Sequence, residues 1–278
     1  MQVRAPAKIN LNLRVLARNP VTGFHDIETW MTPVTLADEL RVELTRTPGI
    51  QLTCSDPDLQ TDSGNLAWRA AEIFLEAAEH PGGAKIELHK NIPHGAGLGG
   101  GSSDAAAVLT SLNVASGHPL PSDQLLQLAA QLGSDVPFFI EGQAALAKGR
   151  GEQLSRHPLP HALDLLLLKP PFGIETAWAY RQWGTAVTVP QRWIEAQEYA
   201  GIKLGNDLER PVFAKHLVLA VMKEWLLQQS TVAAAAMSGS GSSLFAILHQ
   251  GAPADQLAEA ARRAFGSSLW TASCRTLR

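Results

Sequence analysis

The sequence predicts an α+β protein with two domains, residues 1–152 and 153–278. Patterns typical of strands and of helices interleave along the chain without regular βαβ spacing and without a visible repeat, as they do in α+β domains. A mass of 29.8 kDa leaves room for two domains of ordinary size. The loop 148–152 alternates glycine with charged residues, and we place the domain boundary near it.

The first half is predicted to contain strands at 3–15, 85–89 and 144–148, and helices at 65–79, 104–116 and 123–132. In the helix at 65–79, apolar residues recur at helical spacing, and a His-Pro-Gly-Gly run ends the pattern. Ser122 is predicted to cap the helix that begins at Asp123, and Gly133 to end it.

The second half begins with the apolar run 164–169, which predicts a buried strand followed by two prolines. A helix is expected near 214–229. Two further strands, at 233–237 and 244–249, flank a second glycine-rich loop, and the last helix is expected near 253–265.

The most informative segment is 93–104, which joins the strand at 85–89 to the helix beginning at Asp104 and holds five glycines within seven residues. Glycines let a backbone approach a ligand closely and adopt positive φ angles. The N–H groups and dipole of the helix start attract anions. Ser102 and Ser103 add hydroxyl donors for a phosphate or a magnesium ion. The segment therefore predicts a phosphate-binding loop.

Other interpretations of this loop fit less well. Gly95, Gly97 and Gly100 have the G-x-G-x-x-G spacing of dinucleotide folds, but the acidic residue expected about 20 residues later is replaced by a polar helix start. A Walker A loop needs a lysine after the glycines, and a protein kinase needs H-R-D and D-F-G motifs, none of which is present. A flexible linker would carry polar residues on both sides rather than a strand and an alanine-rich helix.

The pattern P-x-G-x-G-L-G-(G/S)-G-S-S resembles that of the GHMP small-molecule kinases. Residues 6–11 resemble the family's N-terminal P-A-K-(I/L)-N-L motif, and residues 238–245 resemble its C-terminal glycine-rich motif. Further segments resemble the members of this family that act on 4-diphosphocytidyl-2-C-methyl-D-erythritol. These segments are 8–11, 23–25, 65–66, 133–139 and 206–208. Phe24 departs from the tyrosine that is common there.

This resemblance implies the two-domain GHMP kinase architecture: a ribosomal-S5-like N-terminal domain, a ferredoxin-like C-terminal domain and an active site in the cleft between them. It implies an ATP-dependent kinase of the 2-hydroxyl of 4-diphosphocytidyl-2-C-methyl-D-erythritol, in the non-mevalonate isoprenoid pathway, with Mg²⁺ accompanying ATP. The alternatives are another GHMP kinase, of the homoserine or mevalonate type, and a catalytically silent GHMP protein that senses a metabolite. A sensor would not need both Lys8 and Asp135.

The resemblance implies that Asp135 accepts the proton of the substrate hydroxyl and that Lys8 is the lysine that lies beside it. Asp135 follows the end of a predicted helix, and Lys8 lies in an apolar strand. Because an isolated buried charge is costly, pairing would satisfy both and keep Asp135 ionised. From local sequence alone, Asp135 could equally well be a surface turn residue, and Lys8 could equally well be a charged residue at a strand edge.

The remaining site residues follow from the glycine-rich loop and from the family resemblance, with Thr176 as a neighbour in the base pocket. ATP binding is assigned to Pro93, His94, Gly95, Ala96, Gly97, Leu98, Gly99, Gly100, Gly101, Ser102 and Ser103, with Asn65 and Lys90 near the adenine. Substrate binding is assigned to Asn10, Phe24, His25, Thr176, Tyr180 and Gly239. Phe24 and Tyr180 would stack on cytosine while His25 hydrogen-bonds its edge. The structural alternatives are a helix cap for Asn65, core packing for Tyr180 and a solvated strand face for Asn12.

Composition narrows the class of protein. With 45% hydrophobic and 18% charged residues the chain is globular rather than disordered. A net charge of −3 without a basic cluster makes nucleic acid an unexpected partner. No apolar run approaches the roughly 20 residues of a membrane span, no signal peptide opens the chain, and Cys54 and Cys274 form no metal-spaced pair. We expect a reduced, cytoplasmic protein.

Overall fold

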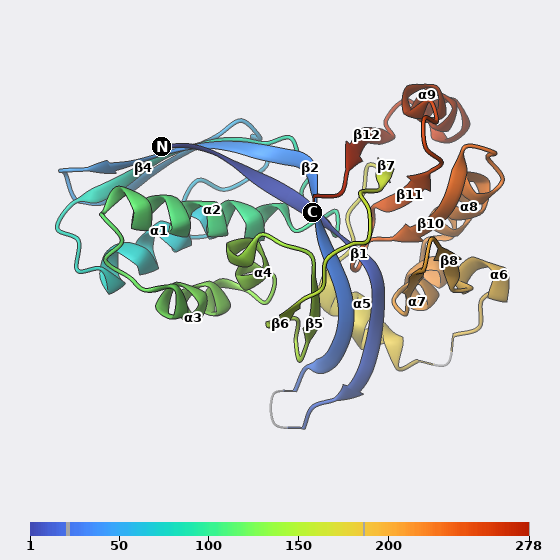
Figure 1. Cartoon of the computed structure of the whole chain (residues 1–278), viewed down its shortest axis with the longest axis horizontal. Helices are drawn as coiled ribbons and strands as arrows, with labels where there is room; N and C mark the ends of the chain where they lie inside the picture. Colours follow the sequence, from blue (N-terminus) through green and yellow to red (C-terminus); the bar gives the residue numbers. More distant parts are fainter. Residues whose placement is uncertain (21–22, 186, 278) are drawn as a thin grey trace. The chain divides into compact units, whose positions relative to one another are not determined.

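The computed structural model describes residues 1–20, 23–185 and 187–277 (Figure 1). These residues form two compact units, each built from separate stretches of chain. Unit 1 comprises 1–7, 37–93 and 99–143; unit 2 comprises 8–36, 94–98 and the described residues from 144 onward. Two long strands, β1 (Gln2–Arg18) and β2 (His25–Thr45), contribute to both units. This division differs from a single cut near 152, and that boundary stays a prediction.

Unit 1 combines strands with a layer of helices. The strand order is β3-β4-β2-β1, where β3 (Gly49–Cys54) runs parallel to β4 (Gly83–His89) and β2 runs antiparallel to β4. The helices are α1 (Leu66–Ala77), α2 (Gly100–Ala115), α3 (Ser122–Leu132) and α4 (Val136–Glu141). Figure 1 shows α1 and α2 below these strands. Side chains from strands and helices share one apolar core, with Phe74, Ile86 and Leu109 fully buried.

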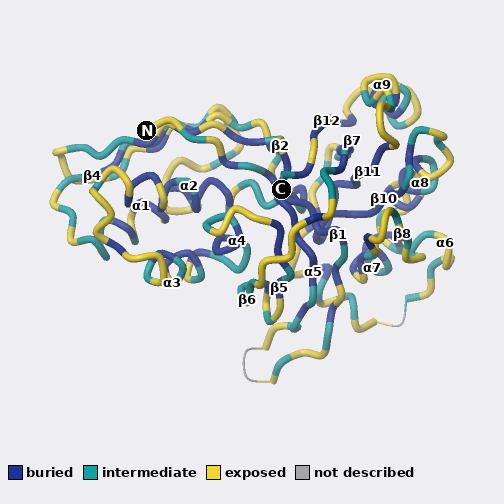
Figure 2. The backbone as a smooth tube through the Cα atoms, in the orientation of Figure 1, coloured by how far each residue is buried: buried dark blue, intermediate teal, exposed yellow. Residues whose placement is uncertain are grey.

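Unit 2 contains a four-stranded antiparallel sheet with the strand order β10-β11-β7-β12. Its elements follow the chain as β7 (Asp164–Lys169), α8 (Leu217–Leu227), β10 (Val232–Met237), β11 (Leu244–Leu248), α9 (Ala254–Phe265) and β12 (Trp270–Arg275). This βαββαβ order is that of ferredoxin-like domains, which confirms the predicted fold of the C-terminal part. Figure 2 shows β7, β10 and β11 buried over most of their length.

Shorter elements complete unit 2. The strands are β5 (Ala145–Lys148), β6 (Gln153–Arg156), β8 (Gln197–Tyr199) and β9 (Ile202–Asn206). The helices are α5 (Thr176–Trp183), α6 (Gln191–Ile194) and α7 (Glu209–Lys215). β9 pairs in parallel with β1 at Asn12 and Leu13, and β5 pairs with β2 at 29–31. The β1–β9 pairing places Gly205 and Asn206, at the end of β9, beside Asn12 and Leu13 of β1.

Several sequence predictions were wrong in detail. The cap of α3 is Pro121 rather than Ser122, which is the first residue of the helix. The expected helix at 214–229 is two helices, α7 and α8, separated by His216 with φ −114° and ψ 69°. Strand β2 was not predicted at all, because Pro33 lies inside it and a proline normally argues against an interior strand. Asn12 is half-buried rather than solvated, and its Oδ1 accepts a hydrogen bond from the Trp30 N–H at 3.0 Å.

Candidate active site

The first glycine-rich loop has the backbone that the sequence predicted. Gly95, Gly97 and Gly99 have φ angles of 60°, 74° and 72°, a region that other residues rarely adopt. Gly99 is the N-terminal cap of α2, so the helix begins at Gly100, four residues before the predicted start at Asp104. The first N–H groups of a helix have no partners within it. The loop therefore ends on a helix start of the kind that binds phosphate.

Within unit 2 the two glycine-rich loops are joined. The Ser238 hydroxyl donates to the Gly97 carbonyl at 2.9 Å, and the Ser243 N–H donates to the Ala96 carbonyl at 3.1 Å. A Cβ on Gly97 would lie only 2.2 Å from the Ser238 carbonyl oxygen. The second loop, Ser238–Ser243, is thus more than a hairpin turn between β10 and β11, because it packs directly on the first loop.

Strand β1 adds Lys8 and Asn10 to this arrangement. The Lys8 N–H donates to the Leu98 carbonyl at 2.9 Å, and the Asn10 N–H donates to the Ser238 hydroxyl at 3.3 Å. The Lys8 ammonium donates to Asn10 Oδ1 at 2.6 Å, and Asn10 Nδ2 donates to the Thr29 hydroxyl at 2.8 Å. Both Lys8 and Asn10 are buried, with 4% of their surface exposed. Three segments far apart in the sequence therefore meet in unit 2. Ser238 belongs to the second glycine-rich motif, whereas Thr29 lies outside every recognised motif, and no local pattern pointed to it.

The predicted site residues of unit 1 are placed as follows. Asp135 is half-buried and immediately precedes α4, where Pro137 occupies the first turn. Asn65 is the N-terminal cap of α1: its Oδ1 accepts from the Ala67 N–H at 2.9 Å, and its Nδ2 donates to the Gln60 carbonyl at 2.8 Å. These contacts give Asn65 the structural role of a helix cap. The Lys8–Asp135 pair has one member in each unit, and the pairing stays a prediction.

Lys90, expected near the adenine, lies in a buried ionic cluster. Its ammonium donates to Asp38 Oδ2, and to Asp104 Oδ2 at 2.7 Å, while Asp38 Oδ1 accepts from the N–H groups of Asn91 and Ile92. The three charged side chains are at most 7% exposed. A Cβ on Gly100 would lie 3.0 Å from Ile92 and 3.4 Å from the Lys90 ammonium. The cluster therefore packs under the start of α2. In the sequence, the only indication of this cluster was Asp104, which follows the glycine-rich loop.

Burial of this cluster raises the pKa of one of its carboxyl groups strongly. Two carboxylates share one ammonium. Burial raises the pKa of Asp104 to about 7, and the Asp38 charge adds to that effect, while Lys90 opposes it. Burial alone would lower the pKa of Lys90, but Asp104 and Asp38 outweigh it and raise that pKa.

The stability of the protein should consequently depend on the ionisation of Asp104. Since its folded-state pKa lies above the ordinary value near 4, the native state binds the proton more tightly than the unfolded state does. As the pH rises from about 4 to 7, we expect ionisation of Asp104 to lower the unfolding free energy by up to about 1.4 kcal/mol per pH unit. Urea titrations of the wild type and of Asp104→Asn across this range measure the slope. Equal slopes for the two proteins would contradict the assignment.

Of the residues expected to hold cytosine, His25 and Tyr180 contact each other within unit 2. The rings of His25 and Tyr180 are stacked with centroids 6.4 Å apart, and Trp183 meets His25 edge-on at 5.4 Å. Phe24 is 58% exposed, with the Arg150 guanidinium 5.6 Å from its ring centroid. The Thr176 hydroxyl is 2.9 Å from the Ser240 hydroxyl of the second glycine-rich loop. Tyr180 also packs against the apolar core of unit 2.

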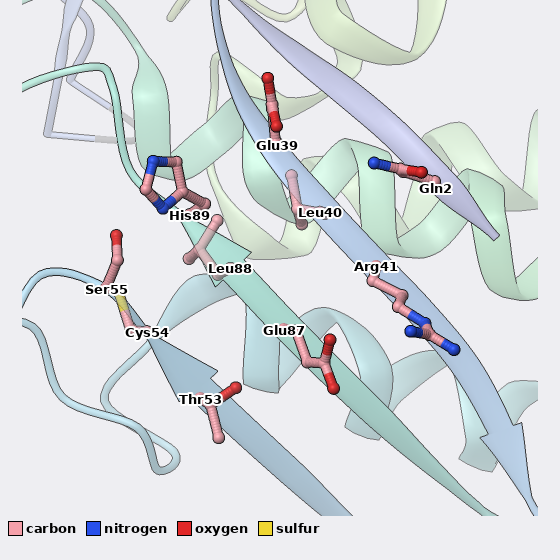
Figure 3. Close-up of a pocket in the computed structure, with 10 residues that line it drawn as sticks. All are labelled: Gln2, Glu39, Leu40, Arg41, Thr53, Cys54, Ser55, Glu87, Leu88 and His89. Atoms are coloured by element: carbon pink, nitrogen blue, oxygen red, sulfur yellow. The ribbon is translucent and has the colours of Figure 1, made fainter.

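A separate pocket of about 520 Å³ lies on the strands of unit 1. Figure 3 shows its side chains coming from β2, β3 and β4, with Gln2 from β1. They include Glu39, Arg41, Glu87 and His89, polar side chains that suit a solvated sheet face. None of the predicted site residues lines this pocket, so it has no part in the candidate active site.

The residues that the structure describes are 1–20, 23–185 and 187–277, and two further features concern only these ranges. None of the helices in these ranges is long and apolar enough to cross a membrane. The same ranges hold no group of three histidine, cysteine, aspartate or glutamate side chains that could bind a metal ion, and Cys54 and Cys274 are free thiols.

Comparison with known proteins agrees with this geometry. Residues 65–143 match the family model of the GHMP kinases N terminal domain, and residues 187–267 match that of the GHMP kinases C terminal region. A 4-diphosphocytidyl-2-C-methyl-D-erythritol kinase from Methylacidiphilum infernorum is 40% identical, covering 96% of this chain and 93% of the relative. The kinase of the same name from Geobacter sulfurreducens is 37% identical, covering 100% and 99%.

Solved structures give the same result. The crystal structure of a 4-(cytidine 5'-diphospho)-2C-methyl-D-erythritol kinase matches with a TM-score of 0.79 and 36% identity, over 99% of both chains. The homoserine kinase from Cytophaga hutchinsonii matches with a TM-score of 0.64 at 19% identity, covering 100% of this chain and 94% of that one, and shares the fold. The family models, the full-length relatives and the linked glycine loops agree, and the chain therefore belongs to the GHMP kinase family.

Proposed function

We propose that this protein is an ATP-dependent kinase that phosphorylates the 2-hydroxyl of 4-diphosphocytidyl-2-C-methyl-D-erythritol. The observation that carries the proposal is the joining of three segments in unit 2. Backbone N–H groups of β1 at Lys8 and Asn10 donate to Leu98 of the first glycine-rich loop and to Ser238 of the second. Such an arrangement suits phosphoryl transfer, which depends on positioning and on charge compensation.

The proposed reaction assigns a task to each charged residue. Asp135 takes the proton of the substrate hydroxyl while that oxygen forms a bond to the γ-phosphorus of ATP. The bond between the γ-phosphorus and the β–γ bridging oxygen breaks, and ADP leaves. Lys8 compensates negative charge near the transferred group. The hydrogen bond from the Lys8 ammonium to Asn10, at 2.6 Å, orients the lysine within the buried strand.

The loop residues suit a nucleotide with magnesium. The Ser103 hydroxyl is buried and has no hydrogen-bond partner among the described residues, which is the condition of a group that a phosphate or an ion would satisfy. Magnesium usually takes most of its ligands from phosphates and water, with one or two from the protein. Ser103 would supply such an oxygen, and the ion would neutralise charge on the phosphates.

Cytosine recognition distinguishes this substrate from those of other GHMP kinases. His25 Nδ1 lies 2.9 Å from the Leu16 carbonyl. Because a carbonyl only accepts, Nδ1 carries a hydrogen, and in the neutral imidazole Nε2 is then an acceptor. The exocyclic amine of cytosine is a donor and would complement that nitrogen. The Tyr180 ring stacked beside His25 supplies an aromatic face for the base.

An ATP-turnover assay tests the proposal directly. The protein is mixed with ATP and magnesium, with and without 4-diphosphocytidyl-2-C-methyl-D-erythritol, homoserine or mevalonate. We expect ADP release to require the diphosphocytidyl alcohol. Turnover with one of the other alcohols would assign the chain to a different GHMP kinase, and binding without turnover would identify a metabolite sensor. The cytoplasmic location expected from the sequence remains a prediction.

Stacking on cytosine leads to a further prediction. We expect Phe24→Leu and Tyr180→Leu each to weaken binding of the diphosphocytidyl substrate by about 1–3 kcal/mol, the scale of aromatic–base stacking. Phe24→Tyr keeps the ring and is the matched control. Isothermal titration with each ligand separates the effects, because ATP affinity should not change. Unchanged affinity for the cytidine compound in both leucine variants would refute the pocket assignment.

A further inference from the structure

A buried ion pair lies beside the second glycine-rich loop and has no part in the reaction proposed above. Lys223 of α8 donates to Glu209 Oε2 of α7 at 2.7 Å, and both side chains are at most 2% exposed. Lys223 also donates to the Trp193 carbonyl at 2.9 Å. Desolvating two charges often costs more than their attraction returns, so stability alone is a weak reason for such a pair.

The second carboxylate oxygen of Glu209 contacts the backbone at the start of the second glycine-rich loop. Glu209 Oε1 accepts a hydrogen bond from the Met237 N–H at 2.9 Å. Asn206 holds the other side of the same residue, since its Nδ2 donates to the carbonyls of Met237 and Gly239 at 2.8 and 2.7 Å. Met237 is the last residue of β10. The buried side chains of Glu209 and Asn206 therefore hold the N–H and the carbonyl of Met237, where β10 ends and the loop begins.

The loop position that results is tied to the candidate site. Ser238 follows Met237 and contacts Asn10 and Gly97 through its hydroxyl. Gly239 lies so close to both that a Cβ there would be 3.2 Å from the Gly97 carbonyl oxygen and 3.4 Å from Asn10 Oδ1. Asn10 in turn bonds the Lys8 ammonium. A shift of Met237 would therefore be transmitted to the group that orients Lys8.

We propose that Glu209, with its orientation set by Lys223, and Asn206 are positioning residues that hold the second glycine-rich loop against Asn10 and Gly97. They act through the backbone of Met237 and Gly239. The catalytic consequence rests on the proposed kinase function, whereas the placement of the loop does not.

Two double variants test the proposal. Glu209→Met with Lys223→Met removes the acceptor of the Met237 N–H. Glu209→Gln with Lys223→Met keeps an amide oxygen there and serves as the matched control. Both replace the pair by neutral side chains, which avoids an unpaired buried charge. For each protein we would measure the melting temperature, kcat, KM for both substrates, and hydrogen–deuterium exchange of peptides covering 232–248.

We expect the control to keep kcat within about threefold of the wild type and the methionine pair to lower kcat about tenfold, since small misplacements of a reacting group are costly. KM for the cytidine substrate should change little. Exchange should rise at 237–243 in the methionine pair only, while β11 stays protected. Equal kcat and equal exchange in the two double variants would overturn the proposal.

Two further comparisons keep the test decisive. If the wild type has no kinase activity, the proposed function fails, but the exchange comparison still tests the placement of the loop. If neither double variant folds, Asn206→Ala replaces them, because it removes two donors without stranding a charge. It should raise exchange at 237–243 and lower kcat at unchanged KM. Wild-type values for both quantities would refute the positioning role.

Discussion

Replacing Asp135 by asparagine is expected to lower kcat by about 100-fold or more, the effect of losing a general base. The amide keeps the shape of the side chain but cannot accept the proton of the substrate hydroxyl. Asp135 immediately precedes α4 and is half-buried. Both substrates should bind almost as they do to the wild type. Steady-state kinetics with titration of each ligand measures the two quantities.

Asp123→Asn provides a control for this variant. Asp123 is an exposed aspartate in the first turn of α3, also in unit 1. It has no place in the proposed reaction, and its substitution should leave kcat unchanged. Near-normal turnover of Asp135→Asn would remove Asp135 from the mechanism. A matching loss of activity in both variants would point to a general effect of removing an acidic group.

The second large effect is expected at Gly97. Gly97→Ala places a methyl group 2.2 Å from the Ser238 carbonyl oxygen and 3.0 Å from that of Gly241, both backbone atoms that cannot simply rotate away. The two glycine-rich loops must then separate. Because a displacement near 1 Å can cost about 100-fold in rate, we expect a loss of that order in kcat/KM for ATP.

Gly95→Ala separates this steric effect from backbone strain. Gly95 also has a positive φ, 60° against 74° at Gly97, but the atom nearest to a methyl group added there is Gly173 Cα, at 3.8 Å. Both variants therefore carry the left-handed strain of about 1–3 kcal/mol, and only Gly97→Ala adds the overlap. Kinetics and thermal melts of both proteins give the comparison. Equal losses at the two positions would mean that the close approach of the loops is unimportant.

Local sequence patterns predicted much of the fold. The strand at Asp164–Lys169 and the helix at Ala254–Phe265 follow from an apolar run and from helical spacing, which depend on neighbouring residues alone. The positive φ angles of the first loop follow from its glycines. Strand β2 was missed because its central Pro33 is tolerated only in the finished sheet. The break at His216 was missed because Leu217 and its neighbours continue the apolar pattern.

By itself, the sequence determined the family, through three motifs whose spacing needs no structure to be recognised. Only the tertiary structure decided which atoms join those motifs: the Ser238 hydroxyl donates to the Gly97 carbonyl, the Asn10 N–H to the Ser238 hydroxyl, and the Lys8 N–H to the Leu98 carbonyl. It also gave Asn65 the role of a helix cap and placed Lys90 between two aspartates. The physical reason is that hydrogen bonds are made between residues up to 245 positions apart, and no local pattern records such a partner.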